Sequence, residues 1–583
     1  MELVMMNKME IALSTEELKK RTSKKYLTTK VLLKKDAPEF SALKDGDKTA
    51  LKHLVKAASI LEEAFLKMDD PRNLAFRDFL NSRIKNGTPE EKTKARLAQK
   101  LFKAQKGINA VDREANKFSL LAGASELPGK GLYPADLTKE EFHRILSQML
   151  EHGKADEVAK ILNQRSVVIR NGAELKALDY TEAFAKEFKL AAARLKKAAE
   201  TSTDKDFSEF LVLQAEALTA ADPMKDAYAD KKWASLQDTP LELTITRESY
   251  ADEMTETVYE NQKLSESLKA CNITPISKDM LGIRVGIVNR QGTEQLLEIQ
   301  KYLPELAKLM PFSEKYEQTI SASKAAPKQT MVDVDLVTVK GDTGAYRAGI
   351  TLAENLPNDD KLSLTIGGGR RNVYHRQIRA VSDLKEQQKM LDAVLAKDLH
   401  QFYLNEADHW FTIGHENGHS LGPNKNTDVL GKYKSIIEEN KADMVSVSML
   451  DKLVSLGMYD EMQKKQIITT FMVRNILKAK PNLSQAHRVR TVMQMYHFIK
   501  EGAVSVKDSV LHIDYDKVIP AARKMLEMII DIQISNSFEK GEKYVLEYFH
   551  WTDELDALAA KMRKVNKSLN GTVKEPLANS LLR

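Results

Sequence analysis

The residues of this chain best suited to chemistry are two histidines and a glutamate in the pentapeptide His415-Glu416-Asn417-Gly418-His419. On a helix, residues four apart lie on one face, so His415 and His419 can direct two imidazole rings at one metal ion. Glu416 then lies beside that ion, where its carboxylate can take a proton from bound water. The pentapeptide therefore predicts a metal-binding helix with Glu416 as a general base.

Three acidic residues in the next predicted helix supply the remaining parts of such a site. Catalytic zinc sites use three protein ligands and leave one position open, and two His plus one Glu is a common set. Glu439, 20 residues after His419, is the predicted third ligand. Asp443 lies one turn further on the same face, where it can accept the free N–H of a ligand histidine, and Glu438 is expected to assist. The alternative, two amphipathic helices with solvated charges, does not explain why all these residues occur together.

Other histidines lie close to the pentapeptide in sequence, and any of them is an alternative ligand. These are His375, His400 and His409. His409 does not share a helical face with His415, because the two are six residues apart. We expect all three to be structural or exposed.

Composition limits the class of protein. A chain of 583 residues is too long for one core, so two or more domains or lobes are expected. Lys and Arg exceed Asp and Glu only by 89 − 83 = 6, which gives no indication of nucleic-acid binding. No apolar run reaches the length of a membrane span, and the N-terminal residues lack the apolar core of a signal peptide. The single cysteine, Cys271, excludes a disulfide framework and favours a cytoplasmic location.

The apolar pattern predicts a mainly helical chain with a few strands in its middle. Six residues between Asp47 and Met68 recur at helical spacing, and residues 180–222 are also expected to be helical. Alternation predicts strands at 241–246, 331–339 and 346–352, with a further candidate at 282–288, which points to a small sheet or barrel. From about residue 382 we expect almost only helices, at 383–404, 406–421, 432–456, 460–479, 483–501, 516–534 and 538–566.

Two features of the pentapeptide helix bear on how it packs. Gly418 costs about 1 kcal/mol of helix stability relative to Ala, so we expect it to let another backbone approach closely. Gly422 and Pro423 follow the motif and predict that the helix ends there.

The motif pair resembles that of the dipeptidyl-peptidase III family, whose second motif has the form E-E-x-R/K-A-D/E. Three further stretches are similar to family segments, and together they extend from about residue 240 to the C-terminus. Asn355-Leu356-Pro357-Asn358 resembles the N-x-P-N segment that holds the N-terminal end of the substrate peptide. His487, after Ala486, resembles the catalytic-pocket histidine. The remaining stretch, Leu241 to Tyr250 with Glu242, resembles the strand that binds the substrate amine. The first 240 residues match more loosely.

The chain departs from the better-known family members at two places. Those members have a six-residue H-E-x-x-G-H motif, whereas this chain has the five-residue form. Thr244 stands where they carry a tyrosine of the catalytic site, and Tyr250 is a candidate to replace that phenol.

The resemblance implies a mainly α fold with a small β-barrel and two lobes separated by a wide cleft. Residues 1–258 plus 330–378 would form the mixed helix and barrel lobe, and residues 259–329 plus 379–583 the helical catalytic lobe with one zinc ion. The implied enzyme is a zinc metallopeptidase that releases dipeptides from the N-termini of oligopeptides, as a cytoplasmic monomer or homodimer. Two alternatives stay open: a zinc hydrolase of the same fold with another specificity, such as an aminopeptidase or other amide hydrolase, and a non-catalytic peptide-binding relative.

The resemblance also implies roles for the remaining candidate residues. His487 would stabilise the oxyanion of the tetrahedral intermediate, with Tyr250 as the next candidate. The ammonium group and first amide of the peptide would be held by Glu242, Asn355 and Asn358.

Overall fold

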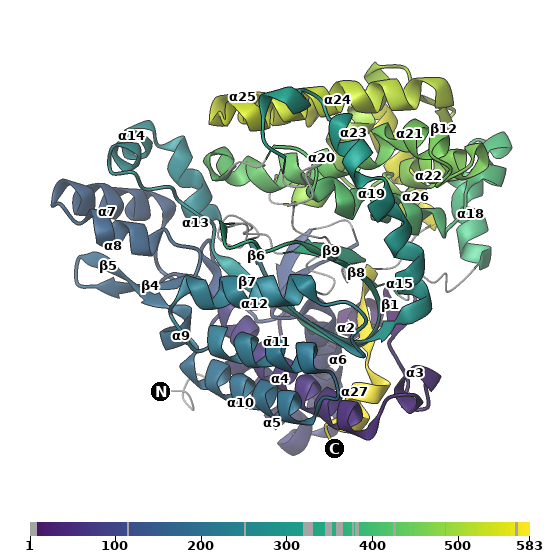
Figure 1. The fold of residues 1–583 in the computed structure, drawn as a ribbon. Coiled ribbons are helices and arrows are strands. Elements are labelled where there is room, and N and C mark those ends of the chain that lie inside the picture. The colour runs from purple at the N-terminus through teal and green to yellow at the C-terminus, as the bar shows by residue number, and fades with distance from the viewer. Residues whose placement is uncertain are drawn as a thin grey trace. The chain divides into compact units, whose positions relative to one another are not determined.

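The computed structural model describes residues 9–113, 116–249, 252–318, 330–343, 352–356, 365–375, 378, 384–423, 427–483, 485–565 and 569–583. The chain divides into two compact units (Figure 1). Unit 1 comprises Met1–Val288, Val334–Thr351 and Ser568–Arg583, and unit 2 comprises Asn289–Asp333 and Leu352–Lys567. The two-lobed arrangement and the lobe boundaries inferred from the resemblance stay predictions.

Unit 1 is built largely from helices. Those among its described residues are α2 (Thr15–Arg21), α3 (Pro38–Ser41), α4 (Asp45–Asp69), α5 (Asn73–Asn86), α6 (Pro89–Gln105), α7 (Lys139–Glu151), α8 (Ala155–Ile161), α9 (Tyr180–Ala183), α10 (Ala185–Thr201), α11 (Lys205–Ala217), α12 (Pro223–Ser235), α13 (Glu253–Glu256), α14 (Gln262–Ala270) and α27 (Pro576–Leu581).

The core of unit 1 forms around α4, which packs against α10, and α10 in turn packs against α11. The apolar stripe predicted for α4 is confirmed, because its members are all buried: Leu51, Leu54, Val55, Ala58, Leu61 and Phe65. The helical character predicted for residues 180–222 is confirmed, in the three helices α9, α10 and α11. The break before α11 has a local cause, since Asp204 caps that helix by accepting a hydrogen bond from the Phe207 N–H at 2.8 Å.

The strands of unit 1 include all but one of the predicted ones. They are β1 (Leu27–Val31), β2 (Asn109–Val111), β3 (Lys117–Ser119), β4 (Ser166–Asn171), β5 (Glu174–Asp179), β6 (Leu241–Ser249), β7 (Asp279–Asn289), β13 (Leu569–Lys574) and most of β8 (Thr330–Gly341). The strand predicted at 346–352 lies almost entirely outside the described residues.

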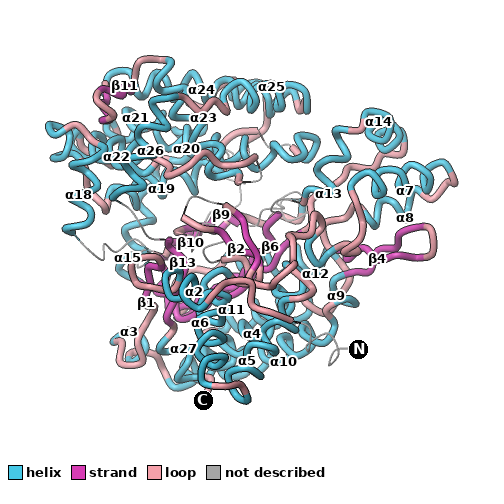
Figure 2. The backbone as a smooth tube through the Cα atoms, turned by 180° about the vertical axis from the view of Figure 1, so that it is seen from behind, coloured by secondary structure: helices cyan, strands magenta, loops and turns pink. Residues whose placement is uncertain are grey.

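The largest sheet has the strand order β6-β7-β8-β10-β9 (strands magenta in Figure 2). Strands β6 and β7 are antiparallel. The first residues of β8 belong to unit 2, where they pair in parallel with β10 (Arg371–Tyr374), and β10 pairs antiparallel with β9 (Ala353–Leu356). In the part of the chain that the structure describes, β6 and β9 are edge strands and no sheet closes on itself. The mainly helical fold with small sheets is confirmed, whereas the predicted barrel is not.

Unit 2 is a helical assembly that carries the pentapeptide. Its helices are α15 (Arg290–Leu296), α16 (Leu303–Lys308), α18 (Leu384–Val394), α19 (Ala407–His419), α20 (Lys434–Ser448), α21 (Leu450–Ser455), α22 (Glu461–Arg474), α23 (Ala486–Lys500), α24 (Tyr515–Ser535), α25 (Phe538–Tyr548) and α26 (Asp553–Val565). Helix α20 lies at the centre, in contact with α19, α23 and α24. One continuous apolar core extends through these helices.

The C-terminal region is less uniformly helical than its sequence predicts. A hairpin of β11 (Val504–Lys507) and β12 (Val510–Ile513) interrupts it. The two residues between these strands, Asp508 and Ser509, have φ of 53° and 57°, the left-handed geometry of a two-residue hairpin turn. The helices predicted over 383–404, 432–456 and 538–566 are each divided, the last into α25 and α26.

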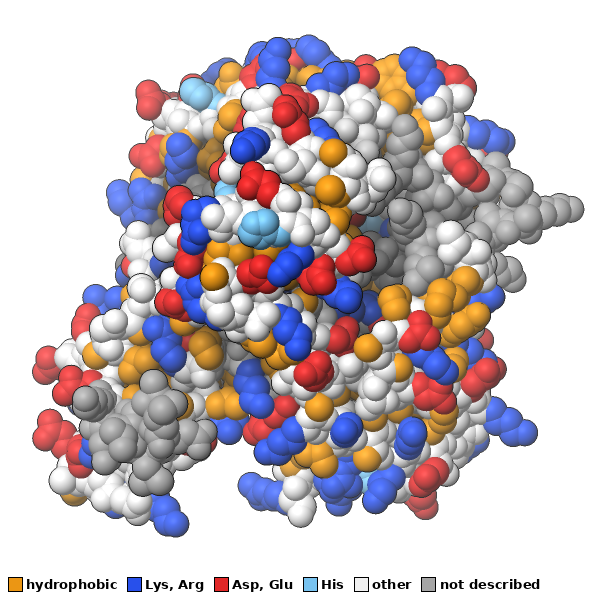
Figure 3. Space-filling model, turned by 90° about the vertical axis from the view of Figure 1, so that its left-hand side faces the viewer, with side chains coloured by type: hydrophobic (Ala, Val, Ile, Leu, Met, Phe, Trp, Pro, Cys, Tyr) orange, Lys and Arg blue, Asp and Glu red, His pale blue; other side chains and the backbone are white. Residues whose placement is uncertain are grey.

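Charged side chains of both signs are interspersed over the face of the molecule in Figure 3. This distribution agrees with the small net charge of the sequence. Among the described residues, none of the helices is both long enough and apolar enough to cross a membrane.

Candidate metal centre

Helices α19 and α20 approach each other closely because glycine lines their contact. A Cβ added at Gly418 would lie 2.8 Å from the carbonyl oxygen of Ala442 and 3.0 Å from its Cα. Gly414, one turn earlier, faces Ser446, whose hydroxyl donates a hydrogen bond to the Phe411 carbonyl at 2.7 Å. The close approach predicted at Gly418 is confirmed, and Gly414 extends it by a turn.

The end of α19 also agrees with the sequence. The helix ends at His419, and Gly422 follows with φ of 109°, in the left-handed region that favours glycine. The next residue, Pro423, has no N–H to continue the helical hydrogen bonds. His419 is thereby placed in the last turn, facing α20.

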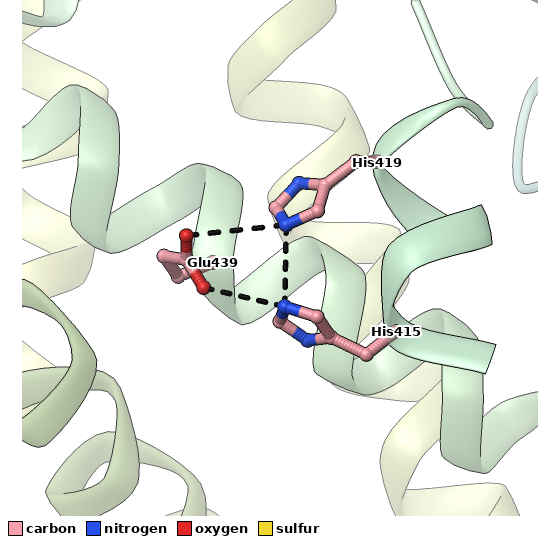
Figure 4. A group of neighbouring side chains, drawn as sticks. All are labelled: His415, His419 and Glu439. Carbon is pink, nitrogen blue, oxygen red and sulfur yellow. Dashed lines mark hydrogen bonds and ion pairs between the residues drawn. The ribbon is translucent and has the colours of Figure 1, made fainter. Parts of the chain in front are cut away.

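The close helix pair brings the three predicted ligands together (Figure 4). His415 Nε2 lies 3.2 Å from His419 Nε2 and 3.5 Å from Glu439 Oε2, and His419 Nε2 lies 3.9 Å from Glu439 Oε1. One donor atom from each of the three residues falls within 4.8 Å of the others. Two ligands about 2.0–2.1 Å from a tetrahedral zinc ion would be about 3.3 Å apart, so the three side chains fit one such ion.

Each histidine is oriented by a carboxylate on α20. His415 Nδ1 lies 2.7 Å from Asp443 Oδ1, and His419 Nδ1 lies 3.0 Å from Glu438 Oε1. An ionised carboxylate accepts the Nδ1–H, which leaves the Nε2 lone pair for a metal ion. Both Nε2 atoms are thus directed at the point that Glu439 also faces.

The electrostatics of the group reflect its burial and its opposite charges. Burial lowers the pKa of His415, but the hydrogen bond and charge of Asp443 outweigh it and raise the pKa to about 9, so a metal ion would displace a proton from Nε2 on binding. For His419 burial prevails, and its pKa is lowered. Burial opposes ionisation of Glu439 as well, yet the neighbouring imidazoles, His487 first, hold its pKa well below the ordinary value. Glu439 is therefore ionised, as a zinc ligand must be.

Glu416 lies on the buried face of α19 and is 4% exposed. It directly follows His415, and its charge raises the pKa of that imidazole. Its predicted role as the general base stays a prediction.

His487 contacts the metal-ligand group through Glu439. Its Nδ1 lies 3.1 Å from Glu439 Oε2, and its side chain is 46% exposed. The contact assigns His487 a partner that the sequence analysis did not predict. The predicted role of this residue at the oxyanion stays a prediction.

Asn355 lies in β9 and is 5% exposed. Its amide nitrogen donates hydrogen bonds to Ser420 Oγ at 2.9 Å and to Asn372, and its oxygen accepts from Arg370. Ser420 directly follows α19, so Asn355 connects β9 to the end of the motif helix. Its predicted role in substrate binding stays a prediction.

Of the remaining predicted substrate-binding residues, the structure describes Glu242. Glu242 belongs to unit 1, is 1% exposed and accepts a hydrogen bond from Trp233 Nε1 at 2.7 Å. Thr244, on the same face of β6, is also buried. Tyr250 and Asn358 lie outside the described residues.

Sequence reasoning missed four residues that hold the two carboxylates. Arg490 and Gln494 extend from α23 to Asp443, while Lys441 and Gln533 contact Glu438. The spacing of His487, Arg490 and Gln494 at i, i+3 and i+7 places them on one face of α23. This polar stripe is the sequence signal that could have indicated Arg490 and Gln494.

The alternative histidines do not join the described metal-ligand group, which consists of His415, His419 and Glu439. His400 is instead hydrogen-bonded to the Leu395 carbonyl at 3.0 Å, and the ring of His409 contacts that of Tyr374.

His415, His419 and Glu439, on adjacent helices, could hold a metal ion, and two His plus one Glu is a donor set that catalytic zinc sites use. Solved structures identify the fold that carries it. The structure of dipeptidyl-peptidase III from Corallococcus sp. strain EGB matches with a TM-score of 0.78, 20% identity and coverage of 98% of this chain and 99% of that one. The structure of DPP III from Caldithrix abyssi matches with a TM-score of 0.73, 22% identity and coverage of 96% and 100%. The predicted resemblance is confirmed: the chain has the dipeptidyl-peptidase III fold.

Sequence comparison adds little to this result. No protein-family model matches the chain. It is similar to Nudix hydrolase 3 of Arabidopsis thaliana, with 23% identity over 93% of this chain and 72% of that protein. An identity this low does not transfer an activity.

Proposed function

We propose that this chain is a zinc-dependent exopeptidase that removes dipeptides from the N-termini of oligopeptides. The observation that carries the proposal is the convergence of His415, His419 and Glu439 on one point, with both Nδ1 atoms held by carboxylates. The dipeptidyl-peptidase III fold supports the choice of a peptide as substrate. The single cysteine supports a cytoplasmic location.

His415, His419 and Glu439 would hold the zinc ion. When bound there, zinc would polarise the scissile carbonyl and make a water molecule acidic enough to attack it near neutral pH. Glu416 accepts the proton of the attacking water and passes it to the leaving amine. Burial beside His415 suits Glu416 to this transfer, because few solvent molecules compete for its carboxylate.

His487 is the proposed donor to the oxyanion, with Tyr250 as the second candidate. The exposure of the His487 side chain is compatible with contact to a substrate. Its Nδ1 contact with Glu439 would fix the ring, so that a developing negative charge meets a donor already in position.

The proposed substrate register uses Glu242, Asn355 and Asn358 to bind the free peptide N-terminus, as the family resemblance implies. A carboxylate suits an ammonium group, and amides suit the first peptide bond. Blocking the peptide amine should therefore abolish binding.

Assays on dipeptidyl-naphthylamides test the proposal, with single-residue naphthylamides and N-acetylated peptides as comparison substrates. We expect the wild type to release dipeptides and Glu416→Gln to retain zinc but lose turnover. Release of single amino acids would identify an aminopeptidase, and equal cleavage of blocked peptides an endopeptidase. Tight peptide binding with no hydrolysis by the wild type would identify a non-catalytic relative.

A further inference from the structure

Two carboxylates that orient the ligand histidines have matching sets of partners. Asp443 accepts hydrogen bonds from His415 Nδ1, the Arg490 guanidinium and Gln494 Nε2, the last at 2.8 Å. Glu438 accepts from His419 Nδ1 at 3.0 Å, Lys441 Nζ at 2.8 Å and Gln533 Nε2 at 2.8 Å. Each carboxylate thus binds one imidazole, one cation and one glutamine amide.

We propose that Arg490 and Gln494 on one side, and Lys441 and Gln533 on the other, are positioning residues for the metal ligands. This inference rests on the proposed zinc site. The cation and the amide fix each carboxylate, and the carboxylate fixes the imidazole, so that both Nε2 atoms point to one ion before it binds.

The orientation of each carboxylate depends on how many hydrogen bonds hold it, and from which directions they come. A carboxylate held only by an imidazole can rotate about its side-chain bonds and take the ring with it. In Asp443, one oxygen faces His415, while the other is held by Arg490 and Gln494. Charge-assisted hydrogen bonds are about twice as strong as neutral ones, and the cations also offset buried negative charge.

The side chain of Gln494 is held by hydrogen bonds to two asparagines. Its Oε1 accepts from Asn475 Nδ2 at 3.0 Å, and its Nε2 donates to Asn440 Oδ1 at 3.0 Å in addition to Asp443. This network fixes which end of the amide faces Asp443. Gln494 therefore presents its N–H group, and not its carbonyl oxygen, to the Asp443 carboxylate.

Arg490 also reaches the third ligand. Its Nε lies 3.7 Å from Glu439 Oε2, while its terminal nitrogen binds Asp443. One guanidinium thus faces both a ligand and the carboxylate that orients another ligand. Lys441 reaches a ligand residue only at its backbone, where Nζ donates to the His419 carbonyl at 3.4 Å, and the described contacts of Gln533 include no metal ligand.

The two sides differ in their exposure to water. The side chain of Asp443 is 0% exposed, whereas that of Glu438 is 31% exposed. Water can replace a lost partner of Glu438 but has little access to Asp443. We therefore expect changes at Arg490 and Gln494 to weaken zinc binding more than changes at Lys441.

The test measures metal binding by the full-length protein rather than its activity. Zinc dissociation constants are measured by chelator competition for the wild type, Arg490→Lys, Gln494→Leu and Lys441→Met. The absorption spectrum of the cobalt-substituted protein reports ligand geometry independently of affinity. Thermal midpoints of the metal-free proteins separate a positioning role from general destabilisation.

Arg474→Met provides a matched control. Arg474 pairs with the buried Asp408 at 3.1 Å and so joins α22 to α19, the helix of both histidines. The pair resembles that of Arg490 and Asp443 but touches no ligand among the described contacts. Its loss should reduce thermal stability and leave zinc affinity within about twofold.

The expected result is a fall in zinc affinity of about 10–100-fold in Arg490→Lys and Gln494→Leu, with altered cobalt spectra. Lys441→Met should show a smaller fall. Zinc affinity and spectra equal to those of the wild type in both Arg490→Lys and Gln494→Leu would overturn the inference while leaving the proposed function intact. A wild type that binds no zinc would overturn the proposed function itself.

Discussion

His415 Nδ1 lies 2.7 Å from Oδ1 of Asp443, a carboxylate whose side chain has no exposed surface. Loss of the Asp443 charge should leave the imidazole less firmly oriented. We expect Asp443→Asn, which keeps the size of the side chain, to weaken zinc binding by about 10-fold or more. Chelator competition measures this directly.

Asp451→Asn is a suitable control for that variant. Asp451 lies on α21 in the same unit, and its half-exposed side chain pairs with Lys464 at 3.1 Å. Zinc affinity equal to that of the wild type in Asp443→Asn would contradict the orienting role.

Glu439 should be indispensable for metal binding. Its two oxygens lie 3.5 and 3.9 Å from the ligand nitrogens of the histidines, and it is the acidic member of the described group. We expect Glu439→Ala to lose stoichiometric zinc, as measured by metal analysis after dialysis. A variant that kept one tightly bound zinc per chain would show that another group completes the site.

The local parts of this site could be predicted from the sequence, and the distant parts could not. The positions of His415 and His419 follow from the period of a helix, which is a property of neighbouring residues. Arg490 reaches Asp443 from a helix 47 residues further on, and only the packing of α23 on α20 shows that. The same limit applies to Asn355, whose bond to Ser420 spans 65 residues.

The ends of the helices were also difficult to predict from the sequence. Periodicity predicted that residues 538–566 are helical, and the structure divides them into α25 and α26. The hairpin turn at Asp508 and Ser509 has left-handed backbone geometry that neither residue type requires. Apolar spacing identifies elements better than it identifies where they end.

Gly418→Ala should destabilise the protein, although alanine favours an isolated helix by about 1 kcal/mol. The added Cβ would lie 2.8 Å from the Ala442 carbonyl oxygen and push α19 away from α20. Overpacking of this kind costs about 1–3 kcal/mol, and we also expect weaker zinc binding because the helices carry different ligands. Thermal unfolding and chelator competition measure the two effects, and a rise in thermal midpoint would show that the helices adjust.

The stability of unit 1 should depend on pH through Glu62. Its carboxylate lies 2.7 Å from Lys106 Nζ and 3.6 Å from Lys340 Nζ. Burial alone would raise the pKa of Glu62, but the two lysines lower it from 4.5 to about 2. A carboxyl group with a lower pKa in the folded state stabilises that state above the unfolded pKa, and this contribution is lost as the pH falls toward 2.

Replacing Glu62 by Gln should therefore cost about 1–3 kcal/mol of unfolding free energy near neutral pH. The difference from the wild type should stay constant above about pH 5 and shrink as the pH falls below the unfolded pKa of about 4.5. Urea unfolding at a series of pH values measures it. A difference that is independent of pH would mean that Glu62 acts through packing rather than charge.

His487 allows the last prediction, because its contact with Glu439 adds a second possible role to the proposed one at the oxyanion. If the ring donates to the oxyanion, His487→Ala should lower turnover by about 100–1000-fold while zinc affinity changes little. If the ring acts by holding Glu439, at 3.1 Å, zinc affinity should fall together with turnover.

His487→Gln separates the two roles further, since a glutamine can still donate a hydrogen bond to Glu439 but presents no imidazole to the substrate. Recovery of zinc affinity without recovery of turnover in this variant would support both roles at once. Turnover that held in His487→Ala, or that fell only in step with thermal stability, would make His487 structural. The oxyanion donor would then have to be another residue, and Tyr250→Phe would be the next variant to measure.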